Sequence, residues 1–447
     1  MKKDLRVGFI TTYSGRWPAE LPQKRQEEYG AWLKERLGEA LVAYPAPANT
    51  APQVNEAIEL FQTSRVDLVI MLYGAFTGDD FPVAMADQLN VPMILWAPKE
   101  PFYERDTRLF ANALVAVTMN AASLHRLEKV CHPVYGDKEQ PEIEARVMAL
   151  VAAYDAIRKM RTTMFGLFGY RPTAFYNSAF DEGLIRRVFG IRMEETDLKV
   201  VFDRMEQIDQ ESVRQDIEAL TSQYDTGLVP DGHLENHSKL YFALKELIQE
   251  QGYDFASLKC WPEMGQLHTT PCAVMGRLAD EGLSISCEGD MDAGLAMILQ
   301  RYLTGLPPFV TDMINVDEEA NTLTFWHCGQ PAPSLIDKRD GVIMANHPLA
   351  GQGTAFYGAL KPGAVTIARF CNIRGVYKLF LVKGEAVPTR RNTKGAMVNV
   401  QIQTPVMEFL DRVFKEGIPH HYSLVWQDVA TEMRMVAELL GLEVIEL

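Results

Sequence analysis

The stretch LSISCEGDMDAGLAMILQRYLTG, Leu283 to Gly305, sets the fold of the middle of the chain. It starts as a short apolar run typical of a buried strand, ends that run on Glu288 and Asp290, and resumes as an apolar helix stopped by Gly305. A carboxylate at the end of a buried strand loses hydration, which a metal ion, a hydrogen-bond network or open solvent could offset. The stretch therefore predicts a strand–turn–helix unit with an acidic turn.

The segments before this stretch alternate between strand and helix patterns. Apolar runs at 6–13, 66–74 and 91–98 are typical of parallel strands, and amphipathic helical segments separate them. From about Ile143 a helix leads into a second such unit, with strands predicted at 164–170, 198–205 (LKVVFDRM) and 256–264. This rhythm predicts an α/β fold with two doubly wound parallel-sheet domains. Because no GxGxxG motif follows the first strand, nothing favours dinucleotide binding.

After Leu306-Pro307-Pro308 the pattern changes to β-rich segments separated by Gly and Pro, at 322–329, 363–371, 377–387 and 396–402. These segments predict a β-rich C-terminal domain. The expected domains are an N-terminal α/β domain at 1–158, a central α/β domain at 159–305 and the β-rich domain at 306–447.

Bulk composition excludes several classes of partner. The 447-residue chain has a formal net charge of −15, which argues against binding nucleic acid or an anionic membrane surface. No apolar stretch approaches the length of about 18 residues that a membrane helix needs, and the N-terminal MKKDLRVGFITTYSG is typical of a first strand rather than a signal peptide. The six scattered cysteines contain no CxxC pair, so free thiols and a cytoplasmic location are expected.

Four segments from Glu288 onward carry side chains that could bind a metal. They are CEGD, FVTDM, FWHCG and PHHYSL, which supply the residues Glu288, Asp290, Asp312, His327, His420 and His421. Carboxylates with imidazoles suit Mn²⁺, Fe²⁺, Zn²⁺ or Mg²⁺, and the lack of paired thiolates argues against a structural zinc site. The pattern alone leaves a metal site open beside solvated carboxylates and buried structural histidines.

At these residues the chain resembles the L-arabinose isomerase and L-fucose isomerase superfamily. The CEGDMDAGLAMILQRYLTG stretch is similar to the family's strand–Glu–helix segment, and FVTDM places Asp312 at a spacing close to that of the fucose isomerase branch. His327 in FWHCGQPAPS resembles a metal-binding His of the arabinose isomerase branch, and PHHYSL offers His421 as the last ligand. The likeness covers most of the chain and is strongest from Cys260 to Leu335 and around His421.

The resemblance implies a metal-dependent aldose–ketose isomerase that moves a hydrogen between C1 and C2 of an open-chain sugar through an enediolate. It assigns Glu288 and Asp312 as metal ligands that double as catalytic acid and base, and His421 as a further ligand. His327 is a fourth ligand or a neighbour of the ligands, and Asp290 is expected to cap the following helix. A divalent metal, with Mn²⁺ as first choice, and a homotrimer or homohexamer are also implied.

The substrate is left open at this point. Glu263 and His268 are candidate sugar-binding residues, with a helix-start carboxylate and a loop residue as their plainer interpretations. Arg390 and Arg391 in PTRRNTKG could bind an anionic group, because a guanidinium pairs with oxyanions, or could lie in a solvated loop. One alternative is therefore an isomerase of a sulfo- or phosphosugar such as sulfoquinovose, and another is a non-catalytic sugar-binding protein.

Overall fold

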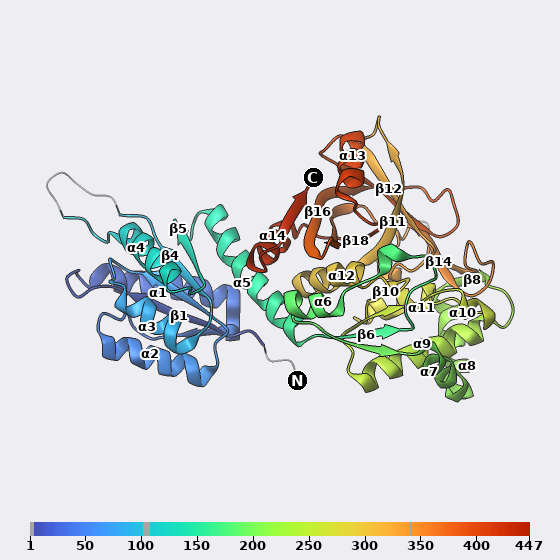
Figure 1. The fold of residues 1–447 in the computed structure, drawn as a ribbon, viewed down its shortest axis with the longest axis horizontal. Coiled ribbons are helices and arrows are strands. Elements are labelled where there is room, and N and C mark those ends of the chain that lie inside the picture. The colour runs from blue at the N-terminus through green and yellow to red at the C-terminus, as the bar shows by residue number, and fades with distance from the viewer. Residues whose placement is uncertain (1–3, 102–107, 340) are drawn as a thin grey trace. The chain divides into compact units, whose positions relative to one another are not determined.

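The computed structural model of the protein describes residues 4–101, 108–339 and 341–447 (Figure 1). The chain divides into two compact units, Met1–Asp155 and Ala156–Leu447. Helix α5 (Pro141–Thr162) contains the division between them. Each unit is described separately below.

The first unit is built on a parallel sheet with the strand order β2-β1-β3-β4-β5. Its central strands are buried along their whole length, because helices lie beside the sheet and leave no solvated face. The strands are β1 (Val7–Thr12), β2 (Leu41–Ala43), β3 (Leu68–Tyr73), β4 (Met93–Ala97) and β5 (Cys131–Tyr135), and the helices are α1 (Glu20–Leu37), α2 (Ala51–Ser64), α3 (Asp80–Leu89) and α4 (Ala113–Arg126).

The second unit begins with a parallel sheet in the order β10-β9-β6-β7. Its strands are β6 (Met164–Phe168), β7 (Arg192–Thr196), β9 (Phe255–Leu258) and β10 (Ile285–Cys287). Its helices are α6 (Glu182–Phe189), α7 (Leu198–Gln207), α8 (Gln210–Gln223), α9 (His233–Gln251), α10 (Glu263–Gln266), α11 (Cys272–Asp280) and α12 (Met291–Thr304). The chain is thus mixed α/β with two parallel sheets.

One predicted strand in this unit is wrong. LKVVFDRM at 198–205 forms helix α7, which begins after Asp197, whose side chain accepts a hydrogen bond from the Lys199 backbone N–H. Leu198, Val201 and Met205 are buried, at the three- and four-residue spacing of one helix face. The cap and the single buried face outweigh the strand preference of the Val-Val-Phe run.

The rest of the second unit is rich in β-structure, as predicted, and includes a barrel (Figure 1). The sheet runs in the order β19-β16-β15-β18-β11-β12-β17-β14-β13-β8, and an additional pairing of β16 with β17 closes the strands between them into a ring. The strands are β8 (Asp225–Leu228), β11 (Phe309–Asp317), β12 (Thr322–His327), β13 (Ile343–Ala345), β14 (Ala355–Ala359), β15 (Gly363–Ile373), β16 (Val376–Val387), β17 (Ala396–Ile402), β18 (His421–Val425) and β19 (Glu443–Glu446), accompanied by helices α13 (Val406–Glu416) and α14 (Ala430–Leu439). Because closure fixes each strand between two neighbours, side chains at the strand ends are held firmly.

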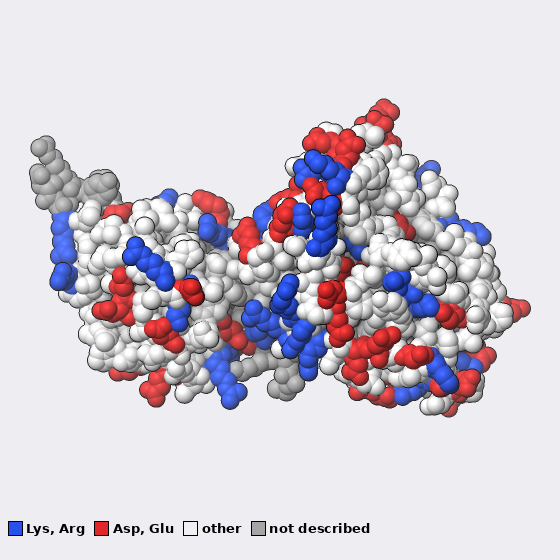
Figure 2. All heavy atoms as spheres, in the orientation of Figure 1, with Lys and Arg blue, Asp and Glu red and all other residues white. Residues whose placement is uncertain are grey.

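Surface charge, the hydropathy of the helices and the state of the cysteines can be compared with the expectations from composition. On the face drawn in Figure 2, Lys and Arg side chains lie among Asp and Glu side chains, with a basic group where α5 ends and over α6. Within the described part of the chain, no helix combines the length and the apolar character needed to cross a membrane. All six cysteines are free thiols.

Candidate active site

Glu288 lies on a sharp turn at the carboxyl end of a buried strand. Strand β10 ends at Cys287, and both Glu288 (φ 58°) and Gly289 (φ 64°) adopt the left-handed conformation before α12 begins. A non-glycine residue adopts this conformation at a cost, and such strain concentrates at functional sites. The turn directs this mostly buried carboxylate, whose side chain is 16% exposed, toward the barrel strands.

Asp312 and His421 face each other across two neighbouring strands of the barrel. Strands β11 and β18 are antiparallel and pair Asp312 directly with His421, so the two side chains project from the same face. A bulge in β11 follows directly after Met313. His327 is the last residue of the next strand, β12, and is buried. The strand order β18-β11-β12 therefore brings three segments of the chain to one place.

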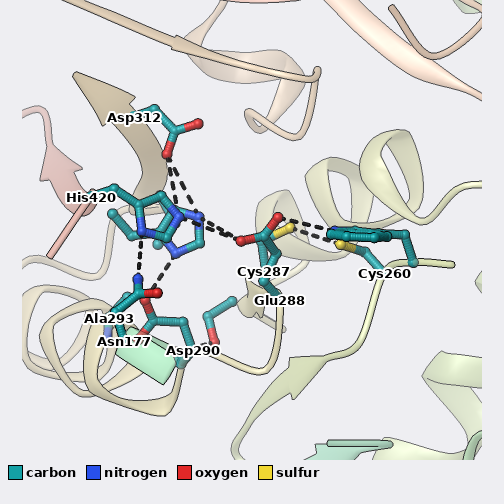
Figure 3. Close-up of polar contacts among 12 residues, drawn as sticks. Asn177, Cys260, Cys287, Glu288, Asp290, Ala293, Asp312 and His420 are labelled. Carbon is teal, nitrogen blue, oxygen red and sulfur yellow. Dashed lines mark hydrogen bonds and ion pairs between the residues drawn. The ribbon is translucent and has the colours of Figure 1, made fainter. Parts of the chain in front are cut away.

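The side chains of these strands meet Glu288 at distances typical of donors around one ion. The Nε2 atom of His421 lies 3.7 Å from Glu288 Oε2 and 3.7 Å from Asp312 Oδ1. His420 Nε2 lies 3.4 Å from the same Glu288 oxygen and 3.9 Å from the same Asp312 oxygen (Figure 3). Two donors that each lie about 2.1 Å from a shared ion are themselves about 3 to 4 Å apart.

Two overlapping sets of residues in this cluster could hold a metal ion. They are Glu288 with His420 and His421, and Asp312 with His327 and His421; in each set the donor atoms lie within 4.8 Å of one another. Three donor atoms in these sets, Glu288 Oε2, Asp312 Oδ1 and His327 Nδ1, are buried without a hydrogen-bond partner. Buried polar atoms are rarely left unpaired, so these atoms fit a divalent cation bound between them.

The carboxylates and imidazoles shift one another's pKa. Burial acts to raise the pKa of Glu288, but its contacts with His420, His421 and Trp261 outweigh burial, and the pKa is lowered. For Asp312 burial prevails over the two imidazoles, and the pKa is raised. Burial lowers the pKa of His327 well below its usual value, which keeps its ring neutral and able to bind a metal. The two carboxylates therefore differ in proton affinity, which is higher for Asp312 than for Glu288.

His421 is oriented from behind by Asp290. Asp290 Oδ2 lies 2.9 Å from His421 Nδ1, so the carboxylate accepts the ring proton there and leaves Nε2 free to face Glu288 and Asp312. Burial acts to lower the pKa of His421, but the hydrogen bond and charge of Asp290 raise it. The prediction that Asp290 caps the helix is also confirmed, because Oδ1 accepts a hydrogen bond from the Ala293 backbone N–H.

A cavity of about 420 Å³ opens beside the two carboxylates. Trp261 closes one side, and its Nε1–H donates to Glu288 Oε1 at 3.2 Å. The other residues that line it are Cys260, Pro262, Gly265, Thr270, Pro271, Cys272, Cys287, Glu288, Asp312, Trp326, His327, Cys328, His347, Leu349, Ala350 and Gln352. Its volume lies in the range of small-molecule sites, about 300–1,000 Å³.

The remaining candidate residues lie at different distances from this cavity. His268 contacts it indirectly, since its Nδ1 lies 3.2 Å from the Oε1 of Gln352, which lines the cavity. Glu263 begins α10 and is paired with Lys259. Arg390 and Arg391 line a second cavity of about 360 Å³, together with Gly341, Tyr357 and Gly358.

The structure places two further residues at the cluster. The sequence analysis names His420 among the side chains that could bind a metal but assigns it no role; the centroid of its ring lies 3.9 Å from that of His421, and its Nε2 faces both carboxylates. Asn177 Nδ2 lies 2.7 Å from His420 Nδ1 (Figure 3). The adjacent His-His pair was a signal for the first, but nothing in the sequence around Asn177 indicated the second.

Comparisons with known proteins find sugar isomerases among the relatives of this chain. Residues 326–447 match the family model of the L-fucose isomerase C-terminal domain. A sulfoquinovose isomerase of Alkalicoccus urumqiensis is 29% identical over 408 residues, covering 90% of this chain and 91% of that protein. A sulfoquinovose isomerase of Priestia aryabhattai is 25% identical over 433 residues, covering 95% and 94%. These similarities support a place for the chain in the fucose isomerase-like superfamily.

The same similarities indicate that the protein is an aldose–ketose isomerase. Its matched L-fucose isomerase C-terminal domain contains His327 and His421, whereas Glu288 and Asp312 precede the matched region. Among solved structures, an arabinose-transporter periplasmic binding protein from Shewanella sp. ANA-3 matches at 11% identity over 67% of this chain and 86% of that one. Its TM-score of 0.17 is too low to support an argument.

Proposed function

We propose that this isomerase interconverts sulfoquinovose, an aldose with a sulfonate on C6, and the corresponding ketose. The observation that carries this proposal is the end-to-end similarity to proteins named sulfoquinovose isomerase, which spans at least 84% of this chain in each case. The carboxylates and imidazoles that gather beside a cavity support this proposal, because acid–base groups and a metal site are what such a reaction needs.

We propose Mn²⁺ as the metal, with Glu288, Asp312 and His421 as ligands and His327 or His420 completing the set. When bound, a divalent cation would stabilise negative charge on the sugar oxygens at C1 and C2. The donor set is hard oxygen and borderline nitrogen, which suits Mn²⁺ better than a thiophilic ion.

Glu288 and Asp312 are proposed to transfer the proton between C1 and C2. A proton carrier works best when its pKa lies near the operating pH, and the raised pKa of Asp312 favours it as the residue that holds the proton in transit. Glu288, whose pKa is lowered, remains the negative partner. Acid–base catalysis of this kind contributes about 10²–10⁴-fold to the rate.

Recognition of the anionic end is proposed to involve Arg390 and Arg391, which line a cavity together with Tyr357. Replacing both arginines by alanine should abolish activity on the sulfonated sugar and spare activity on a neutral aldose, because only the former needs a cation. Equal loss on both sugars would contradict this assignment.

Glu263 and His268 remain proposed sugar contacts near the main cavity, and Gln352 links His268 to the wall of that cavity.

Sheet topology, oligomeric state and cellular compartment are further features that we propose for this protein. We propose that both parallel sheets are doubly wound, because the orders β2-β1-β3-β4-β5 and β7-β6-β9-β10 each extend outward on both sides of the first strand. A homotrimer or homohexamer follows from the family resemblance, and light scattering of the purified protein tests it. Six free thiols support a reducing compartment such as the cytoplasm.

The deciding experiment measures metal content and ketose formation for the wild type and Glu288→Gln. The sugar panel contains sulfoquinovose, its phosphorylated counterpart and neutral aldoses, with Mn²⁺ restored before the assay. Stoichiometric metal in the wild type, its loss in the variant and ketose formed from sulfoquinovose would support the proposal. Ketose formed only from a neutral aldose would overturn the substrate, and activity without metal would overturn the mechanism. Glu218→Gln serves as the matched control, because Glu218 is an exposed residue of α8 that pairs with Arg214 and lies outside both the proposed ligand set and the proposed sugar contacts.

A further inference from the structure

The wall of the main cavity contains an imidazole outside the metal-binding sets, that of His347. It stands on the turn that follows β13. The turn is closed by two backbone hydrogen bonds, from His347 N–H to Gln352 O at 3.0 Å and from Gly351 N–H to His347 O at 2.9 Å. Glu288 and Asp312 line the same cavity, so a sugar bound there lies within reach of this ring.

The turn fixes which ring nitrogen carries the proton. The backbone N–H groups of Leu349 and Ala350 both donate to His347 Nδ1, at 3.2 and 3.1 Å. A backbone N–H can only donate, so Nδ1 is the accepting nitrogen and the proton of the neutral ring is on Nε2. Pro348 has no N–H, which leaves the next two residues to make these bonds. The ring is therefore held in one orientation and one tautomer.

His347 is also neutral at physiological pH. Burial lowers its pKa to about 4. A charged imidazolium would compete with a metal cation in the same cavity, whereas a neutral ring can donate without adding charge. The ring is close enough to His327 that a charge on it would lower the pKa of that residue further.

Four other neutral side chains in the wall already donate a hydrogen bond within the protein. Trp261 donates to Glu288, Trp326 to the carbonyl of Lys394, Gln352 to that of Gly265 and Thr270 to that of Thr354. His347 Nε2–H has no hydrogen-bond partner among the described residues, although Nδ1 has two. A fixed donor with an unused N–H in a ligand-sized cavity is suited to a ligand oxygen.

We infer that His347 is a substrate-binding residue that donates its Nε2–H to an oxygen of the open-chain sugar. This inference rests on the proposed function and adds to it a neutral donor separate from the metal ligands. The hydrogen bond from such a donor becomes stronger as negative charge develops on the sugar oxygen. His347 should therefore affect kcat as well as KM. Its loss should lower kcat/KM about 10- to 100-fold, between the effects of an ordinary hydrogen bond and of an oxyanion donor.

A pair of variants separates the two nitrogens. In His347→Asn the amide oxygen can replace Nδ1 as acceptor for the turn, but no donor reaches the position of Nε2. In His347→Gln the longer amide can donate near the position of Nε2, but the turn loses its acceptor. His347→Asn should keep the wild-type melting temperature and lose activity. His347→Gln should have a lower melting temperature but a higher activity than His347→Asn.

The assay measures kcat, KM, Mn²⁺ content and melting temperature for the wild type and both variants, with the sugar that the wild type isomerises. Wild-type kcat/KM in His347→Asn would overturn the inference while the proposed function stands. Loss of Mn²⁺ in that variant would also overturn it, since His347 would then act through the metal site. A wild type that isomerises no sugar of the panel would overturn the proposed function itself, and the inference with it.

Discussion

Asp290 serves two parts of the site with one carboxylate. Oδ1 caps α12, and Oδ2 accepts the ring proton of His421. The buried guanidinium of Arg369 pairs with both oxygens and also donates to the His421 carbonyl. Both charged side chains are fully buried (0% exposed), so each depends on the other for compensation. The helix start and the orientation of His421 are thereby coupled.

At this scale we predict that Asp290→Asn destabilises the fold by about 3–5 kcal/mol, because it leaves the buried charge of Arg369 uncompensated. It should also weaken metal binding about 10- to 100-fold, because His421 loses the carboxylate that orients it. Denaturant unfolding and metal titration measure the two effects.

The control is Asp203→Asn, which breaks the exposed Lys199–Asp203 pair on α7 and should leave the free energy of unfolding nearly unchanged, because solvent screens exposed pairs. Equal effects of the two substitutions on unfolding would show that the buried pair has no special role.

At the scale of elements, the turn between β10 and α12 depends on Gly289. Its φ of 64° is in the left-handed region, and a Cβ built on it would lie 1.9 Å from the Tyr170 carbonyl oxygen. No side chain fits there without moving the backbone of the segment after β6. The turn that positions Glu288 is therefore fixed by sterics on both sides.

We predict that Gly289→Ala destabilises the protein by clearly more than the about 1–2 kcal/mol that a left-handed L-residue costs. Gly305→Ala is the matched comparison, because Gly305 has a similar φ of 70° and open space around the added Cβ. Unfolding in urea distinguishes them, and equal losses would mean that the segment after β6 can move aside freely.

The first turn of α12 also contains a carboxyl with an unusual pKa. Burial raises the pKa of Asp292 to about 7, and Tyr377 donates a hydrogen bond to it. Since the folded pKa lies above that of the unfolded chain, the folded protein retains a proton that the unfolded chain releases. Its contribution to stability therefore decreases as pH rises from about 4 to about 7.

We predict that Asp292→Asn, which can still accept the Tyr377 hydrogen bond, is more stable than the wild type at pH 8. The difference should shrink as pH falls toward and below about 4, where the carboxyl becomes protonated in the unfolded chain as well as in the fold. The free energy of unfolding measured at several pH values tests this. A difference that does not change with pH would show that Asp292 stays ionised in the fold.

At the scale of the whole molecule, the metal-competent residues all belong to the second unit. The members of both sets lie between residues 288 and 421, inside Ala156–Leu447. Their assembly depends on the closed barrel and on the parallel sheet that ends in β10.

We therefore predict that a fragment from Pro141 to Leu447, which keeps α5 intact, binds Mn²⁺ within about tenfold of the full chain, since every donor is retained. Calorimetric titration measures the affinity, and circular dichroism establishes whether the fragment is folded. A folded fragment without metal binding would show that the first unit is needed for the site.

The sequence by itself determined the features that depend on near neighbours. The strand–turn–helix at 283–305 and the cap by Asp290 follow from local patterning, because the cap links residues three apart. Local preference also misled, as in LKVVFDRM, where burial of one face produced a helix. Only the tertiary structure decided that His420 faces Glu288, that Asn177 contacts His420 and that Arg390 lies at a second cavity. These contacts join residues far apart in the chain, and closure of the barrel, not local sequence, sets which strand ends meet.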